Sequence, residues 1–179
     1  ASSDDNFDVV AYQTVTVTTV DDDTAGFTLS STTATVTEAA GGGNTATYTV
    51  VLNAQPDSDV VISVTSADTG EVTVSAAELT FTNGNWNNAQ TVTLTGVDDN
   101  VIDVDTQTTV TMAVVDASSD DNFDGVSDQT VTVTTTDNDT AGFTLSKTTA
   151  TVSEGADTDT YTVVLDAQPD SDVVISVTS

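Results

Sequence analysis

The side chains able to do chemistry in this sequence are almost all carboxylates. Its 179 residues include 29 Asp and Glu but one basic residue, Lys147, and neither His nor Cys, so the formal net charge is −28. Carboxylate oxygens are the ligands that Ca²⁺ prefers, and it binds ~6–8 oxygens at a time. Because folding brings like charges closer together, we expect cations to balance part of this charge. The sequence therefore predicts calcium sites.

The same composition excludes several classes of function. Nucleic-acid binding depends on Lys and Arg, which displace the counterions of the phosphates, and this chain has one such residue. Without His or Cys there is no His-dependent triad, no thiol nucleophile, no disulfide and no zinc site of the usual kind. No apolar run approaches the ~20 residues of a membrane-spanning helix. We expect neither a nucleic-acid partner, nor insertion into a membrane, nor enzymatic activity.

The sequence repeats itself with a period of about 116 residues. Residues 1–8 recur without change at 117–124, and residues 48–66 recur at 161–179 with one change, Asn53 to Asp166. The second pair has a shorter offset because a Gly-rich stretch is shortened between its members, which is typical of a loop.

This period divides the chain into three parts. Residues 1–23 are expected to be the C-terminal strands of one repeat, residues 24–139 a complete repeat, and residues 140–179 the N-terminal strands of the next. A partial repeat cannot bury its apolar face alone. We therefore expect neighbouring repeats, or other copies of the chain arranged head to tail, to be its partners.

Alternation of β-branched residues with a period of two predicts strands throughout the complete repeat. Turn-forming residues separate seven of them, at 27–36, 46–53, 60–66, 71–81, 90–95, 108–115 and 129–136. Seven strands in a unit of this length favour an all-β, immunoglobulin-like Greek-key sandwich. Val, Ile, Leu and Phe would fill its core, and Thr would face water.

On such a sandwich, separate segments deliver acids to one pole, which we call the acidic pole. Eight candidate ligands lie there: Glu38, Asp68, Asp98, Asp99, Asp103, Asp105, Asp137 and Asp139. The equivalent positions of the partial repeats add Asp21, Asp23 and Glu154. The alternative is that each Asp only favours a solvated turn. Clustered carboxylates without a cation would repel strongly, since charges ~4 Å apart interact by several kcal/mol at an effective dielectric near 20.

Four further segments carry a family resemblance. They are residues 36–39, the run 79–94 around Trp86, residues 97–99 and the closing residues 137–139. Together they resemble Calx-beta repeats, most closely the tandem Calx-beta-like repeats of large bacterial surface and secreted proteins. The resemblance implies an immunoglobulin-like sandwich with calcium at the acidic pole. Carried over, it implies the ligands Glu38, Asp68, Asp98, Asp99, Asp137 and Asp139, and it places Asp103 and Asp105 where the family often has Glu.

A second acidic segment, at 120–125, has acids at alternate positions and a Gly at the turn, as an EF-hand loop does. The twelfth position of such a loop should be Glu, and here it is Val131. A solvated loop is therefore favoured for this segment.

Trp86 is the only Trp of the sequence. We expect it to cap an edge of the sandwich.

These features favour an extracellular structural role. The expected function is a calcium-stiffened extender, or a fibre segment, of a bacterial surface adhesin or secreted fibre, with cell-surface or matrix components as further partners. One alternative is binding of ice or mineral surfaces through Thr rows such as those at 14–16 and 91–93. Another is a secreted carbohydrate-active enzyme module, since paired carboxylates hydrolyse glycosides. In that case the catalytic carboxylates would lie in loops that recur in every repeat.

Overall fold

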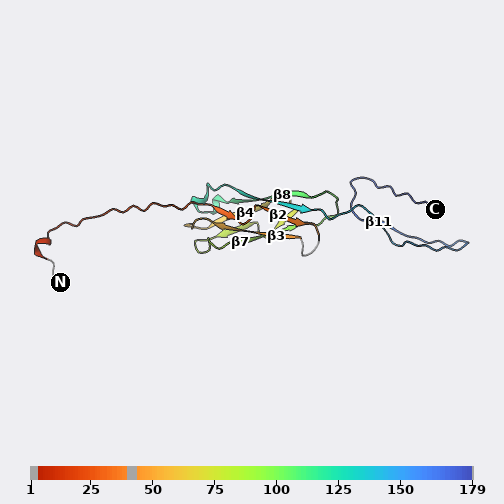
Figure 1. Ribbon diagram of the computed structural model, residues 1–179, viewed down its shortest axis with the longest axis horizontal. Coiled ribbons are helices and arrows are strands. Elements are labelled where there is room, and N and C mark those ends of the chain that lie inside the picture. The colour runs from red at the N-terminus through yellow and green to blue at the C-terminus, as the bar shows by residue number, and fades with distance from the viewer. Residues whose placement is uncertain (1–3, 40–43, 179) are drawn as a thin grey trace.

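Two β-sheets pack face to face in the middle of the chain, between an extended N-terminal segment and a C-terminal hairpin (Figure 1). The computed structural model describes residues 4–39 and 44–178. Within these ranges the helices are three-residue 3-10 turns, and none is long and apolar enough to cross a membrane. The predicted all-β sandwich is confirmed.

Each sheet combines strands that are distant in the sequence. The first sheet has the order β1 (Phe27–Leu29), β3 (Thr45–Leu52), β7 (Gln90–Gly96) and β5 (Val72–Val74). The second has the order β2 (Thr33–Thr37), β9 (Gln129–Thr136), β8 (Thr106–Val114), β4 (Val60–Ser66) and β6 (Glu78–Phe81). Along β9 the Val residues are buried and alternate with partly exposed Thr, as the period of two requires.

Two of the seven predicted strands are each divided between the sheets. The predicted strand at 27–36 forms β1 in the first sheet and β2 in the second, where β2 runs parallel to β9. The predicted strand at 71–81 likewise becomes β5, paired with β7, and β6, paired with β4. A segment that changes sheets in this way covers an edge of both sheets, which leaves fewer unpaired edge groups.

The core lies between the sheets and is formed by side chains such as Ile62, Phe81 and Val131, which are completely buried. Tyr48 is buried among them, and its hydroxyl donates a hydrogen bond of 3.0 Å to Sδ of Met112. Burial raises the pKa of Tyr48 to about 12. Trp86 is partly exposed and packs against this core.

The loop at 115–128 is more buried than the sequence suggests. It contains η2 (Asp116–Ser118) and η3 (Asp121–Phe123). Asp120 accepts hydrogen bonds from the backbone N–H groups of Asp57 at 2.6 Å and Ser58 at 2.9 Å, so it fixes the loop between β3 and β4. Phe123 packs into the core. The expectation of a solvated segment at 120–125 is therefore wrong for Asp120 and Phe123, because tertiary contacts outside the segment bury them.

The two ends of the chain contain little regular structure. Among residues 4–23 the structure forms η1 (Asp5–Phe7) and otherwise an extended chain. In the C-terminal part, β10 (Phe143–Leu145) pairs with β11 (Val163–Leu165). Their register repeats that of β1 and β3, since Phe143 lies opposite Leu165 as Phe27 lies opposite Leu52. The division of the chain into three parts stays a prediction.

Candidate metal centre

Carboxylates from four segments meet at the acidic pole. Glu38 follows β2, Glu71 precedes β5, Asp103 lies in the loop at 97–105, and Asp137 and Asp139 follow β9. Oxygens of Glu38, Asp137 and Asp139 lie within 4.8 Å of one another, and so do oxygens of Glu38, Glu71 and Asp103. Glu38 therefore belongs to both groups, which join into one cluster, the carboxylate cluster.

Several oxygens of the carboxylate cluster are buried without a hydrogen-bond partner. Glu38 is 2% exposed. Its Oε2, Oε2 of Glu71, Oδ1 of Asp103 and Oδ2 of Asp139 accept no hydrogen bond from any residue that the structure describes. Burying a charged group without compensation is costly. Unpaired, buried, negatively charged oxygens are what a hard divalent cation such as Ca²⁺ binds, so the donor set fits this ion.

Burial and neighbouring charges make Glu38 a weak acid in the absence of a cation. Burial is the largest cause, followed by the charges of Asp103, Asp99 and Asp137, and together they raise its pKa from 4.5 to about 7. The backbone N–H of Asn138 opposes this shift. The raised pKa is a measure of how much this site disfavours an uncompensated negative charge.

Glu71 and Asp139 are perturbed in the same direction. Burial is the main cause for both. The charges of Asp103, Asp68 and Asp99 further raise the pKa of Glu71, and the Thr135 hydroxyl lowers it. For Asp139, Asp137 is the neighbouring charge that raises the pKa most. The cluster thus carries a local excess of negative charge.

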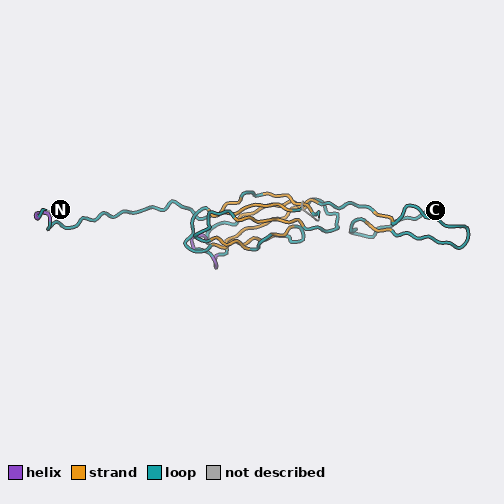
Figure 2. Tube along the Cα trace, turned by 90° about the horizontal axis from the view of Figure 1, so that it is seen from below, coloured by secondary structure: helices purple, strands orange, loops and turns teal. Residues whose placement is uncertain are grey.

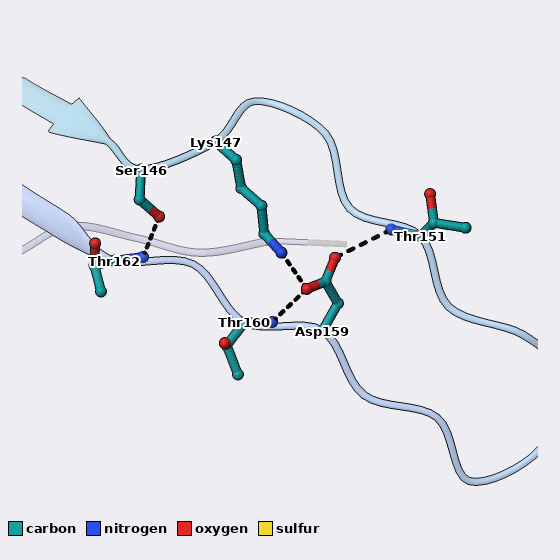
Figure 3. A network of polar contacts seen from close by, with 6 residues as sticks. All are labelled: Ser146, Lys147, Thr151, Asp159, Thr160 and Thr162. Atoms are coloured by element: carbon teal, nitrogen blue, oxygen red, sulfur yellow. Dashed lines mark hydrogen bonds and ion pairs between the residues drawn. The ribbon is translucent and has the colours of Figure 1, made fainter.

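The only basic side chain of the sequence lies elsewhere. Lys147 forms an ion pair with Asp159 between the arms of the C-terminal hairpin (Figure 3). Asp159 also accepts from the backbone N–H groups of Thr160 at 2.8 Å and Thr151 at 3.3 Å. The Lys147 bond contributes most to holding the pKa of Asp159 below its usual value. The carboxylate cluster therefore has no basic side chain to neutralise it.

The loop at 97–105 is attached to the end of β9 by polar contacts. The backbone N–H of Val104 donates to Oδ2 of Asp137 at 3.3 Å, and the Asn138 side chain donates to Asp98 at 3.4 Å. Val104 has φ 65°, an uncommon value for a β-branched residue. Its side chain is 73% exposed, whereas Oδ1 of the preceding Asp103 is buried in the cluster.

The predicted ligands fall into three sets. Glu38, Asp103, Asp137 and Asp139 come together. Asp68, Asp98 and Asp99 lie close enough for their charges to act on the cluster. The remaining predicted ligands are not in the cluster: Asp105 and Glu154 are exposed, and Asp21 and Asp23 line a recess at the opposite pole.

The sequence does not predict Glu71 as a ligand, because it is the first residue of the predicted strand at 71–81. Its position three residues after Asp68, at the start of a strand that begins at the acidic pole, is the signal that would have revealed it.

Comparisons with known proteins give remote structural neighbours. No protein-family model and no curated protein sequence matches the chain. Among solved structures, the apo form of the Calx CBD1 domain aligns at 16% identity with a TM-score of 0.47, over 65% of this chain and 100% of that chain. CBD12 from CALX1.2 aligns at 17% identity and a TM-score of 0.46, over 68% and 49%. The periplasmic chaperone SfaE aligns at 10% identity and a TM-score of 0.43, over 63% and 58%.

Proposed function

We propose that the carboxylate cluster binds Ca²⁺ and that the metal holds the acidic pole together. The observation that supports this most directly is the set of four buried carboxylate oxygens without a partner, on Glu38, Glu71, Asp103 and Asp139. A cation there compensates the burial and the neighbouring charges that otherwise raise the pKa of Glu38 to about 7. Oxygen donors of this hardness suit Ca²⁺ better than the softer transition metals.

The proposed ligands tie together segments that are far apart in the sequence. Glu38 and Glu71 come from the ends of strands in different sheets, and Asp103 comes from the 97–105 loop. These groups meet only in the folded chain, so the free energy of metal binding adds to the free energy of folding. Free Ca²⁺ at ~100 times its Kd stabilises by ~2.7 kcal/mol.

We infer a structural role for this unit outside the cell, as a calcium-stabilised spacer or fibre segment of a surface adhesin or secreted fibre. The near-identity of residues 48–66 and 161–179 supports this, because a spacer can be lengthened by duplication. Asp139 is followed at once by residues 140–142 and β10, with no flexible linker between them. Millimolar Ca²⁺ outside cells makes even weak sites useful there.

Titration calorimetry of the full chain with Ca²⁺ tests the metal site. Glu71→Gln keeps the shape of the side chain and removes its charge, so we expect it to weaken Ca²⁺ binding at least tenfold. Glu78→Gln is the matched control, because Glu78 is exposed on β6 and should leave binding unchanged. Absence of binding heat in the native chain, together with a melting temperature that Ca²⁺ does not change, would contradict the proposal.

A further inference from the structure

One Thr of β9 faces the interior of the sandwich instead of solvent. Along this strand Val131 and Val133 are buried in the core, and Thr135 takes the next inward position. Thr135 is only 1% exposed, so it is an exception to the expectation that Thr would face water. Val at this position would continue the apolar row, and burying a hydroxyl in its place is costly unless a polar partner meets it.

Thr135 belongs to the last interior row of the sandwich before the acidic pole. The strands run along the long axis of the molecule, so their ends gather at the two poles (Figure 2). In the second sheet Thr135 lies opposite Val36 of β2 and opposite Thr106 of β8. Two residues further along these segments, Glu38 follows Val36 and Asp137 follows Thr135. The row that contains Thr135 is therefore next to the carboxylate cluster.

The hydroxyl of Thr135 is an unpartnered oxygen beside Glu71. It lies close enough to Glu71 to lower the pKa of that carboxyl. Neither Oγ1 of Thr135 nor Oε2 of Glu71, however, has a hydrogen-bond partner among residues 4–39 and 44–178. A buried polar atom without a partner costs free energy. Both of these neighbouring oxygens are thus left for a third group that can bind them together.

A hard cation is a group that fits both oxygens. Ca²⁺ binds ~6–8 oxygens, and its ligands include neutral oxygens as well as carboxylates. A Thr hydroxyl has lone pairs for a metal and a proton for a neighbouring acceptor at the same time. The carboxylate cluster already carries an excess of negative charge, and a hydroxyl adds a ligand without adding to this excess.

We propose that Oγ1 of Thr135 is a further, uncharged ligand of the cation at the carboxylate cluster. Its oxygen binds the ion, and its O–H donates to the carboxylate of Glu71 and orients it. The inference rests on the proposed Ca²⁺ site and deepens it. It identifies a ligand that a pattern of acidic residues does not reveal.

Titration calorimetry of the full chain with Ca²⁺ tests this role with a pair of substitutions. Thr135→Val keeps the shape of the side chain and removes the hydroxyl, so we expect Ca²⁺ affinity to fall about tenfold. Thr135→Ser keeps the hydroxyl and should bind Ca²⁺ more tightly than Thr135→Val does. The matched control is Thr134→Val, the same change at the adjacent, outward position of β9. Equal affinities of Thr135→Val and Thr134→Val, or equal losses for the two Thr135 variants, would overturn the inference.

Thermal unfolding distinguishes a ligand from a residue that acts in folding alone. In chelator, Thr135→Val should be at least as stable as the native chain, because it removes a buried hydroxyl without a partner. On addition of Ca²⁺ the melting temperature of this variant should rise less than that of the native chain. An equal loss of stability in chelator and in Ca²⁺ would assign Thr135 to folding alone and would overturn the inference.

A crystal structure of the native chain grown with Ca²⁺ gives a readout that needs no variant. Oγ1 of Thr135 at ~2.3–2.6 Å from the ion would support the inference. An ion bound by Glu71 with Oγ1 of Thr135 outside this range would overturn the inference and leave the proposed metal site intact. Absence of Ca²⁺ binding by the native chain would instead contradict the metal site, and the role of Thr135 with it.

Discussion

The backbone N–H of Val104 donates a hydrogen bond of 3.3 Å to Oδ2 of Asp137, so the 97–105 loop is attached to the end of β9. Val104 adopts φ 65° to make this contact, while its own side chain remains exposed. A β-branched residue in this region is strained by ~1–3 kcal/mol. The strained residue directly follows Asp103, whose carboxylate lies in the carboxylate cluster. Backbone strain of this kind is typical of positions under a functional constraint.

Val104→Gly should therefore be neutral or slightly stabilising. Glycine relieves the strain at positive φ but adds ~0.5–1 kcal/mol of unfolded-state entropy. Val101→Gly is the matched control. Val101 does not have a positive φ, so this substitution relieves no strain and should destabilise the fold by the full entropy cost. Urea denaturation of both variants in the presence of Ca²⁺ measures the difference. A greater loss of stability for Val104→Gly than for Val101→Gly would mean that the φ value carries no strain.

Removing a charge at the acidic pole should affect metal binding, whereas removing one at the opposite pole should not. Asp103→Asn takes away a carboxylate whose Oδ1 is buried and unpartnered, so we expect Ca²⁺ affinity to fall at least tenfold. Asp121→Asn changes an exposed residue of η3 and should leave the affinity within about twofold of native. Titration calorimetry decides between the two positions. Equal losses would place the metal elsewhere.

Without calcium, the fold should be most stable at mildly acidic pH. Burial and then the charges of Asp103, Asp99 and Asp137 raise the pKa of Glu38 from 4.5 to about 7 in the folded chain. Between these two values the folded chain binds more protons than the unfolded chain, so stability decreases as the pH rises. The raised pKa values of Glu71 and Asp139 act with the same sign.

Thermal unfolding in chelator, from about pH 5 to about pH 7.5, measures this dependence. The melting temperature should fall over the interval, and Glu38→Gln should flatten the slope. Saturating Ca²⁺ should oppose the fall, because the metal binds deprotonated ligands. A melting temperature of the chelated native chain that rises across the interval would contradict the assigned environment of Glu38.

Asp120 should be a folding residue and not a metal ligand. Its carboxylate accepts from the backbone N–H groups of Asp57, Ser58 and Asn122, so all its contacts are structural. Asp120→Ala leaves these donors unpaired and should lower the melting temperature by several degrees without changing Ca²⁺ affinity. Asp4→Ala removes the same local bond, to Asn6, from an exposed copy of the motif and should change neither quantity. A loss of Ca²⁺ binding in Asp120→Ala would contradict this assignment.

The repeat shows which features depend on local sequence and which depend on the fold. Residues 4–8 and 120–124 are identical, and both form a 3-10 turn capped by the first Asp. Phe7 is nevertheless 67% exposed, whereas Phe123 is 1% exposed. The turn was therefore predictable from the residues, but the burial of Phe123 and Asp120 was not, because it depends on a sandwich that only one copy contacts.

The same distinction explains the strands and the site. Alternation of Val and Thr predicted the sandwich. Within the predicted strand at 27–36, however, the apolar residues shift from odd positions, Phe27 and Leu29, to even ones, Ala34 and Val36, and this shift of phase marks the change of sheet between β1 and β2. The placement of loops at one pole predicted Glu38, Asp103, Asp137 and Asp139 together. Glu71 was not predicted, because a Glu at the start of a strand is assigned to the strand unless its position close to Asp68 at the acidic pole is also considered.

A crystal structure of the full chain grown with Ca²⁺ tests the central claim most directly. The account predicts an ion at the acidic pole, with oxygens of Glu38, Glu71 and Asp103 at ~2.3–2.6 Å from it. It predicts no ion held by Asp121 at the opposite pole. An empty carboxylate cluster at saturating Ca²⁺, or an ion bound by Asp121 and not by Glu38, would contradict it.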